Sequence, residues 1–284
     1  MITGKGKVAA VLGWPVTHSL SPVLHGHWLD ELNIDGALVP LSASPQNFAA
    51  IIDGLRRSGF TGVNVTVPNK ESAFALAHEN DAAAIAAGAT NLLVFRDGRI
   101  LGRNTDTYGL YASLEEVTGK LNGETVILLG AGGAARGAVL ALDQLGAGTI
   151  HLLNRDAKRA ATLAAALGKQ VKANIIPGGL DGWNAVAKDA ALVVNATAAG
   201  MSGNPPLAID LGLLPKNAVI SDMVYSPLET PLLKDAAERG LKTIDGLGML
   251  MHQAVPSFEA FFGVKPKVTP QLRAALIAAL KARG

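Results

Sequence analysis

The stretch Thr125-Val-Ile-Leu-Leu-Gly130-Ala131-Gly132-Gly133-Ala134-Ala135 decides the fold, because it joins an apolar run to a glycine turn and an alanine-rich segment. The apolar run predicts a buried strand, and the alanine-rich segment predicts a helix to about Leu145. Glycines in such a turn let a pyrophosphate approach the free N–H groups at the helix start. A purely structural glycine turn is the less favoured alternative, given this strand–turn–helix context. We therefore expect a dinucleotide to bind at Gly130, Ala131, Gly132, Gly133 and Ala134.

The next predicted strand ends at Asn154-Arg155, where the adenosine ribose of a dinucleotide should lie. NAD enzymes usually carry an acid at this place, whereas Arg155 and Arg159 supply positive charge for a 2′-phosphate. These residues, with Asn154, predict NADP as the cofactor. Asp156 places a negative charge beside the same site, which leaves the use of NAD open.

Farther out, strand-like runs alternate with helix-like segments along the chain. Strands are expected over residues 8–12, 62–67, 90–95, 99–102, 149–153, 191–195 and 218–222, and helices over 22–32 and 107–117. Ser21 is placed to cap the first of these helices, and Asp97-Gly98 predicts a hairpin turn. Strands separated by helices indicate an α/β fold with parallel sheets, with a boundary between two units near residue 106.

Four clusters of polar residues stand at predicted strand ends, where ligands bind in open α/β sheets. They are His18-Ser19-Leu20-Ser21-Pro22, Asn64-Val65-Thr66-Val67-Pro68-Asn69-Lys70, Thr90-Asn91 and Asn104-Thr105-Asp106. Together they predict a pocket suited to a small polyhydroxylated molecule. Taken singly, Lys70 is typical of a solvated lysine at a helix start, and Asp106 and Ser21 are typical of helix caps.

These motifs resemble those of the shikimate dehydrogenase family, in the same order along the chain. The resemblance covers residues 10 to 263, including the glycine turn, Asn195-Ala-Thr197, Asp222-Met223-Val-Tyr225-Ser-Pro227 and Asp245-Gly246-Leu-Gly248-Met249-Leu-Met-His-Gln253. It implies a substrate-binding α/β domain over 1–106 and 247–284, and a Rossmann-like NADP-binding domain over 107–246. It also implies that the active site lies in the cleft between these domains.

The resemblance further implies a role for each matching residue in the reversible NADPH-dependent reduction of 3-dehydroshikimate to shikimate, a step of chorismate and aromatic amino acid biosynthesis. Lys70 and Asp106 would stand at the reacting oxygen as the catalytic pair. The substrate carboxylate would bind Ser19, Ser21 and Tyr225, and the ring hydroxyls would bind Thr66, Asn91 and Gln253. Met223 and Gly246 would lie near the nicotinamide.

Composition excludes several other classes of function. The 284 residues contain no cysteine, which removes thiol catalysis and disulfides, and the net charge of +2 gives no basis for nucleic-acid binding. No apolar run approaches the length of a membrane span or a signal peptide, so we expect a cytoplasmic protein. The histidines form no metal-ligand pattern, so we predict no metal. We expect a monomer or a homodimer.

Three rival functions remain open on the sequence. One is a quinate/shikimate dehydrogenase that uses NAD as well as NADP, which Asp156 favours. Another is a different two-domain NADP reductase, which would not explain the serine and lysine motifs. The third is a non-catalytic regulator that binds shikimate and NADP, against which the retained Lys70 and Asp106 argue.

Overall fold

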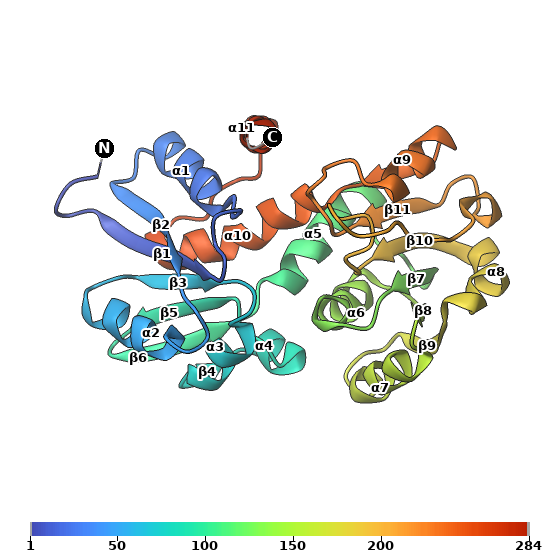
Figure 1. The fold of residues 1–284 in the computed structure, drawn as a ribbon, viewed down its shortest axis with the longest axis horizontal. Coiled ribbons are helices and arrows are strands. Elements are labelled where there is room, and N and C mark those ends of the chain that lie inside the picture. The colour runs from blue at the N-terminus through green and yellow to red at the C-terminus, as the bar shows by residue number, and fades with distance from the viewer. Residues whose placement is uncertain (1, 283–284) are drawn as a thin grey trace. The chain divides into compact units, whose positions relative to one another are not determined.

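The computed structural model describes residues 2–282 and divides into two compact units (Figure 1). Unit 1 comprises Met1–Asp106 with Met251–Gly284, and unit 2 comprises Thr107–Leu250. The division falls inside one long helix, α10 (Gly246–Phe262). The family expectation of an α/β fold is confirmed in both units.

The sheet of unit 1 is mixed, because a hairpin is inserted in it. Its strands follow the order β2-β1-β3-β5-β6-β4: β1 (Lys7–Gly13), β2 (Gly36–Ser42), β3 (Gly62–Val65), β4 (Glu79–Asn80), β5 (Leu92–Arg96) and β6 (Arg99–Arg103). β1 is parallel to β2 and β3, whereas β5 runs antiparallel to both β3 and β6. The predicted turn at Asp97-Gly98 joins β5 to β6, with φ positive at both residues. The expected parallel pairing holds for β1, β2 and β3, and the predicted hairpin adds the antiparallel pair β5–β6.

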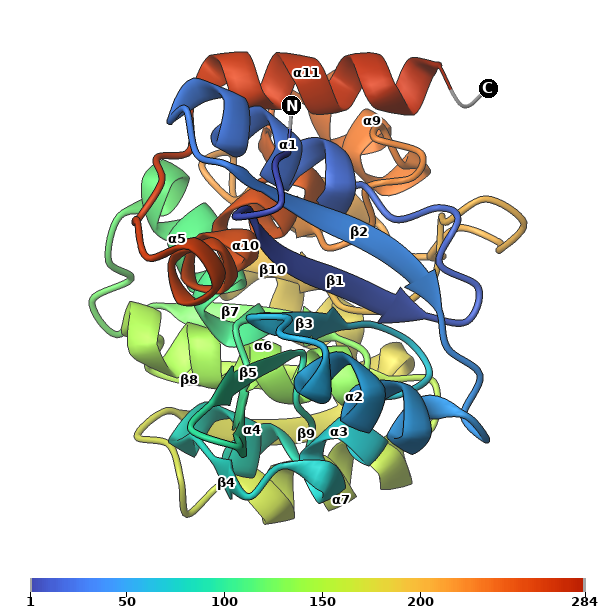
Figure 2. The same cartoon turned by 90° about the vertical axis from the view of Figure 1, so that its left-hand side faces the viewer.

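Helices cover both faces of this sheet. They are α1 (Ser21–Glu31), α2 (Phe48–Arg57), α3 (Lys70–Leu76), α4 (Ala82–Ala87), α10 and α11 (Pro270–Lys281). Phe48 and Ile52 of α2 pack with β1 and β3 on one face. On the other face α1 and α10 lie against the strands, and α11 packs against α1 (Figure 2). Trp28 of α1 meets Phe258 of α10 there at 5.3 Å between ring centroids.

Unit 2 holds an all-parallel sheet in the order β12-β11-β10-β7-β8-β9. Its strands are β7 (Thr125–Leu129), β8 (Thr149–Asn154), β9 (Asn174–Gly179), β10 (Ala190–Asn195), β11 (Val219–Asp222) and β12 (Lys242–Ile244). The order reverses between β7 and β10, so the ends of these two strands form the switch point where doubly wound sheets bind ligands. This arrangement confirms the Rossmann-like prediction.

The apolar run of β7 is buried on both faces, as a central parallel strand requires. α5 (Asp106–Thr118), α6 (Gly133–Leu145) and α7 (Ala157–Leu167) contribute to the core on one face. α8 (Trp183–Val186) and α9 (Pro231–Glu238) contribute to the core on the other face, with short 3-10 turns at Leu180–Gly182, Ala187–Asp189 and Leu211–Leu213. The strand ends, and not these cores, carry the polar residues that the sequence singled out.

Candidate active site

The polar motifs of unit 1 meet at one edge of its sheet. β1 and β3 are parallel and end there, at Gly13 and Val65. The sequence predicts that Asn91 follows a strand, but in the structure it precedes β5. Because β5 is antiparallel to β3, the beginning of β5 lies at the same edge. β6 ends there again and leads into Asn104, Thr105 and Asp106. A reversed strand thus brings Asn91 to the place where the parallel interpretation had put it.

Lys70 and Asp106 form an ion pair, with 2.6 Å from Nζ to Oδ2. Lys70 is the first residue of α3 and Asp106 the first of α5, so each side chain projects from a helix start beside the strand ends. Both side chains are about 30% exposed, at 30% and 27%. A pair this exposed contributes only about 0–1 kcal/mol to folding. The pair therefore fixes the two groups relative to each other and leaves both partly open to solvent.

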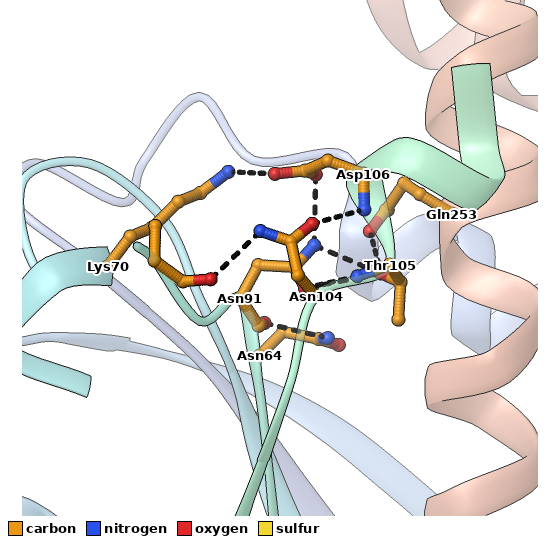
Figure 3. Close-up of polar contacts among 8 residues, drawn as sticks. Asn64, Lys70, Asn91, Asn104, Thr105, Asp106 and Gln253 are labelled. Carbon is orange, nitrogen blue, oxygen red and sulfur yellow. Dashed lines mark hydrogen bonds and ion pairs between the residues drawn. The ribbon is translucent and has the colours of Figure 1, made fainter. Parts of the chain in front are cut away.

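Asn91 and Thr105 hold the other side of the Asp106 carboxylate (Figure 3). Asn91 Nδ2 donates to Asp106 Oδ1 at 2.9 Å and to Thr105 Oγ1 at 3.0 Å, and Asn91 Oδ1 accepts from Thr105 N at 2.8 Å. Asn91 is buried, so these bonds satisfy an amide that water does not reach. Asn104 Oδ1 also accepts from Asp106 N at 3.0 Å. Both oxygens of Asp106 are thus fixed by protein donors, one from Lys70 and one from Asn91.

Helix α10, from a distant part of the chain, contributes two further hydrogen-bond partners to this network. Thr105 Oγ1 donates to Gln253 Oε1 at 3.3 Å, which places the Gln253 amide beside the Asn91–Asp106 pair (Figure 3). One turn farther along α10, Ser257 Oγ accepts from Asn64 Nδ2 of β3 at 2.8 Å. The structure therefore brings together Lys70, Asn91, Asp106 and Gln253 of the predicted substrate site.

Ser19, Ser21 and Thr66 stand at the same edge, after β1 and β3. Ser21 N donates to Ser19 Oγ at 3.3 Å, so the two serines lie together. The methyl group of Thr66 packs over Gly13, where an added Cβ would meet it at 2.5 Å. Ser21 is the first residue of α1 and Leu20 occupies the N-cap position without a side-chain bond. The prediction that Ser21 caps this helix is wrong, and its hydroxyl is not used for that purpose.

The glycine turn of unit 2 fits a bound pyrophosphate. Gly130 has φ +111°, and an added Cβ there would lie 2.9 Å from Thr197 Cγ2. Gly132 precedes α6 without any side-chain cap, and Cβ atoms built at Gly132 and Gly133 would meet nothing within 4 Å. The start of α6 therefore has room beside a bare backbone, and the first N–H groups of a helix have no intrahelical partner, which together is the arrangement that binds phosphate.

A hollow of about 370 Å³ follows the end of β8, lined by Asn154, Arg155, Asp156 and Arg159. Within residues 2–282, neither Arg155 nor Arg159 forms an ion pair with a protein carboxylate. The Asp156 carboxylate accepts from Lys158 N at 2.9 Å and caps α7. Its charge is directed to the helix start, which leaves both guanidinium groups available to an anion.

Met223, Tyr225 and Gly246 belong to unit 2 and follow β11 and β12. An added Cβ at Gly246 would meet the carbonyl oxygen of Met223 at 2.4 Å, so this glycine lets two backbone segments lie together. Val224 O accepts from Gly246 N at 3.3 Å. The predicted nicotinamide-side residues Met223 and Gly246 are therefore neighbours in the structure.

Two further features bear on other ligands. In the part of the chain that the structure describes, no group of three or more His, Asp or Glu residues is arranged to hold a metal ion. A second hollow of about 410 Å³ on unit 1, lined by Lys7, Arg96, Arg103 and Glu259 among others, contains none of the predicted site residues.

No described helix has the length and apolar character needed to cross a membrane.

Thr105 and Asn64 stand within the predicted motifs, but the sequence assigns neither of them a role. Thr105 holds two of the predicted ligand-binding amides, and Asn64 ties β3 to α10. A polar residue that is expected at a buried strand end must find partners, and this requirement is the signal that would have singled them out.

Comparison with known proteins gives a consistent result over the whole chain. Residues 11–93 match a family model described as the shikimate dehydrogenase substrate binding domain, and residues 113–202 match one described as shikimate / quinate 5-dehydrogenase. A curated shikimate dehydrogenase (NADP(+)) of Mesorhizobium japonicum is 48% identical over 275 residues, which cover 96% of this chain and 97% of the relative.

Two solved structures share the fold. Shikimate 5-dehydrogenase of Thermus thermophilus in complex with NADP(H) and shikimate superposes with a TM-score of 0.82 at 32% identity, covering 97% of this chain and 99% of that one. Quinate dehydrogenase of Corynebacterium glutamicum in complex with NAD superposes with a TM-score of 0.88 at 30% identity, covering 96% and 99%. The likeness therefore extends over both units.

Proposed function

Since this chain belongs to the shikimate dehydrogenase family, we propose that it catalyses the reversible reduction of 3-dehydroshikimate to shikimate with NADPH. The observation that carries the mechanism is the Lys70–Asp106 pair, held at 2.6 Å among polar side chains at a strand edge. This reaction is a step of chorismate biosynthesis, which supplies the aromatic amino acids.

NADPH, when bound, supplies the hydride for the ketone carbon. The protein must then protonate the oxygen of that ketone as negative charge develops on it. Lys70 Nζ is the donor that we assign to this step, and in the reverse direction the neutral amine takes the proton back from the hydroxyl. The amine lies on a helix start at the strand edge and remains partly exposed, so a substrate oxygen can replace water beside it.

Asp106 has two tasks in this proposal. Its Oδ2 fixes the Lys70 amine, and its Oδ1, held by Asn91, stays oriented towards a hydroxyl next to the reacting carbon. Thr66, Asn91 and Gln253 bind the ring hydroxyls. Ser19, Ser21 and Tyr225 bind the carboxylate through their hydroxyl groups.

The residues present also fit NADP. Gly130, Ala131, Gly132, Gly133 and Ala134 provide the open helix start for the pyrophosphate, and Asn154, Arg155 and Arg159 line the hollow for the 2′-phosphate. Met223 and Gly246 stand on the nicotinamide side. Because Asp156 is occupied as the cap of α7, we infer that NADP is preferred over NAD.

We propose residues 1–106 and 247–284 as the substrate-binding domain and residues 107–246 as the NADP-binding domain. A monomeric or homodimeric state and a cytoplasmic location stay predictions. Size-exclusion chromatography with light scattering measures the first.

The test is a steady-state assay of shikimate and quinate, each with NADP and with NAD, on the unaltered protein and on Lys70→Ala. The proposal expects shikimate with NADP to be the fastest pair. It expects Lys70→Ala to lower kcat by about 10²–10⁴-fold while shikimate still binds, measured by calorimetry. Near-normal turnover in Lys70→Ala would remove the lysine from the mechanism.

A second candidate is a quinate/shikimate dehydrogenase, which the likeness to the NAD-bound quinate dehydrogenase favours. It predicts a rate with quinate and NAD that equals or exceeds the rate with shikimate and NADP. Binding of shikimate and NADP without any NADPH formation at high pH would instead support the third alternative, a non-catalytic regulator that binds both molecules.

A further inference from the structure

Asp222 is a buried carboxylate that the proposed mechanism does not use. It is the last residue of β11 and is 0% exposed. In the parallel register it lies opposite Asn195, the last residue of β10, which is equally buried. β10 is one of the two strands at the switch point of the sheet.

Three donors from three segments converge on this carboxylate. Oδ1 accepts from Asn195 Nδ2 at 3.0 Å and from Val224 N at 3.0 Å, and Oδ2 accepts from Thr230 Oγ1 at 2.7 Å. Thr230 in turn caps α9, where its hydroxyl accepts from Leu233 N. Burial raises the pKa of Asp222, whereas these three hydrogen bonds act in the opposite direction.

The two bonds to Oδ1 organise the loops that carry the cofactor residues. The bond from Val224 N closes a turn around Met223, and Gly246 packs on the backbone of that turn. Asn195 Oδ1 accepts from Thr197 N at 3.0 Å and from Thr197 Oγ1 at 2.7 Å, which fixes the loop after β10. That loop lies against Gly130 of the glycine turn.

We propose that Asp222 is the positioning residue of the nicotinamide end of the NADP site: through Val224 N and Asn195 it sets the backbone around Met223 and the loop beside the glycine turn. The proposal rests on the proposed function. Asp222 does not contact the cofactor or the substrate in this account. Its effect reaches the nicotinamide through Met223 and Gly246, while Arg155 and Arg159 hold the adenosine end independently.

This division predicts that the two ends of the cofactor respond differently to the loss of Asp222. NADP+ probes the whole site, and adenosine 2′-monophosphate, which carries no 5′-phosphate, probes the adenosine end alone. Asp222→Ala should weaken NADP+ at least about tenfold while the 2′-monophosphate binds within twofold of its original affinity, both measured by calorimetry. Hydride transfer should slow, so the primary deuterium isotope effect on kcat with 4-deuterated NADPH should rise.

Two further variants separate positioning from stability. Asp222→Asn keeps an acceptor for Asn195 and Val224 N but loses the charge, so it should fold if Asp222→Ala does not and should weaken NADP+ about threefold or more. Thr230→Val removes only the bond to Oδ2 and the cap of α9. It should lower the unfolding temperature and leave both binding affinities and the isotope effect unchanged.

The outcomes are distinct. If Asp222→Asn and a folded Asp222→Ala bind NADP+ as tightly as the unaltered protein, Asp222 is only structural and the proposal is overturned. The same conclusion follows if both ligands weaken equally, because the nicotinamide end is then not singled out. Failure of the unaltered protein to bind either ligand would instead refute the proposed NADP-dependent function itself.

Discussion

His25 should make the protein lose stability as the pH falls below about 6.5. The residue lies in α1, is 0% exposed, and neither ring nitrogen has a hydrogen-bond partner among residues 2–282. Its ring is surrounded by Trp28, Phe258, Phe261 and Phe262, with centroid distances of 5.7 Å to Phe258 and 6.0 Å to Trp28. This apolar cage disfavours the charged imidazolium, so burial lowers the pKa of His25 from 6.5 to about 3.

The sign follows from the protons that each state binds. Between pH 6.5 and about 3 the unfolded chain holds a proton on His25 that the folded protein does not, so stability rises with pH in this window. The difference in pKa corresponds to about 5 kcal/mol when the window has been crossed completely. Between pH 7 and pH 5 it amounts to about 2 kcal/mol of unfolding free energy.

The assay is urea unfolding at pH 7, 6 and 5 for the unaltered protein and for His25→Leu, which fills a similar volume with apolar atoms. His25→Leu should lack about 2 kcal/mol of the acid-induced loss between pH 7 and 5. His27→Leu is the matched control, since it removes a histidine from a partly exposed position two residues farther along α1. Equal pH dependence in His25→Leu and the unaltered protein would refute the reasoning.

Three other substitutions test the sites. Arg155→Ala should raise KM for NADP about tenfold or more and leave KM for NAD nearly unchanged in steady-state assays, because a charged hydrogen bond to the 2′-phosphate is lost. An equal rise in KM for NAD would contradict this assignment. Gly130→Ala should lower the free energy of unfolding by about 1–3 kcal/mol in urea and weaken NADP+ in calorimetry, because its φ of +111° is strained for alanine and the methyl group meets Thr197; unchanged stability would count against this. Thr105→Val should raise KM for shikimate about threefold to tenfold, because the hydrogen bonds to Asn91 and Gln253 are lost. Thr105→Ser keeps the hydroxyl, so its KM for shikimate should stay close to that of the unaltered protein. Equal effects of the two changes would exclude the hydroxyl as the cause.

The strands that sequence reasoning predicted are those with an apolar run of their own. Residues 125–129 and 218–222 lie in the middle of the unit 2 sheet, where burial on both faces makes such runs necessary. The strands over Gly36–Ser42 and Asn174–Gly179 were not predicted. Each lies at a sheet edge and contains a proline, and each is held by pairing with a single distant strand, which no local pattern announces.

The site was predictable to the extent that its residues are contiguous in short motifs. Lys70, Asn91 and Asp106 stand in such motifs, and the fold brings them to one edge. The hydrogen bonds that fix them are not local: Asn91 and Thr105 are 14 residues apart, and Thr105 and Gln253 are 148 apart. Which buried polar groups satisfy one another depends on strand order, and the sequence predicts the β5–β6 hairpin but not the antiparallel pairing of β5 with β3.

Asp222 extends this argument to the cofactor side. Its motif was recognised, but its partners Asn195 and Thr230 lie on another strand and at another helix start. Burying a carboxylate has an unfavourable desolvation free energy unless each hydrogen-bond donor is in place. We therefore expect such a group where a fixed geometry is needed. In the proposed function the two networks, one around Asp106 and one around Asp222, therefore act alike: each uses a carboxylate at a strand or helix end to fix groups that the substrate or the cofactor would meet.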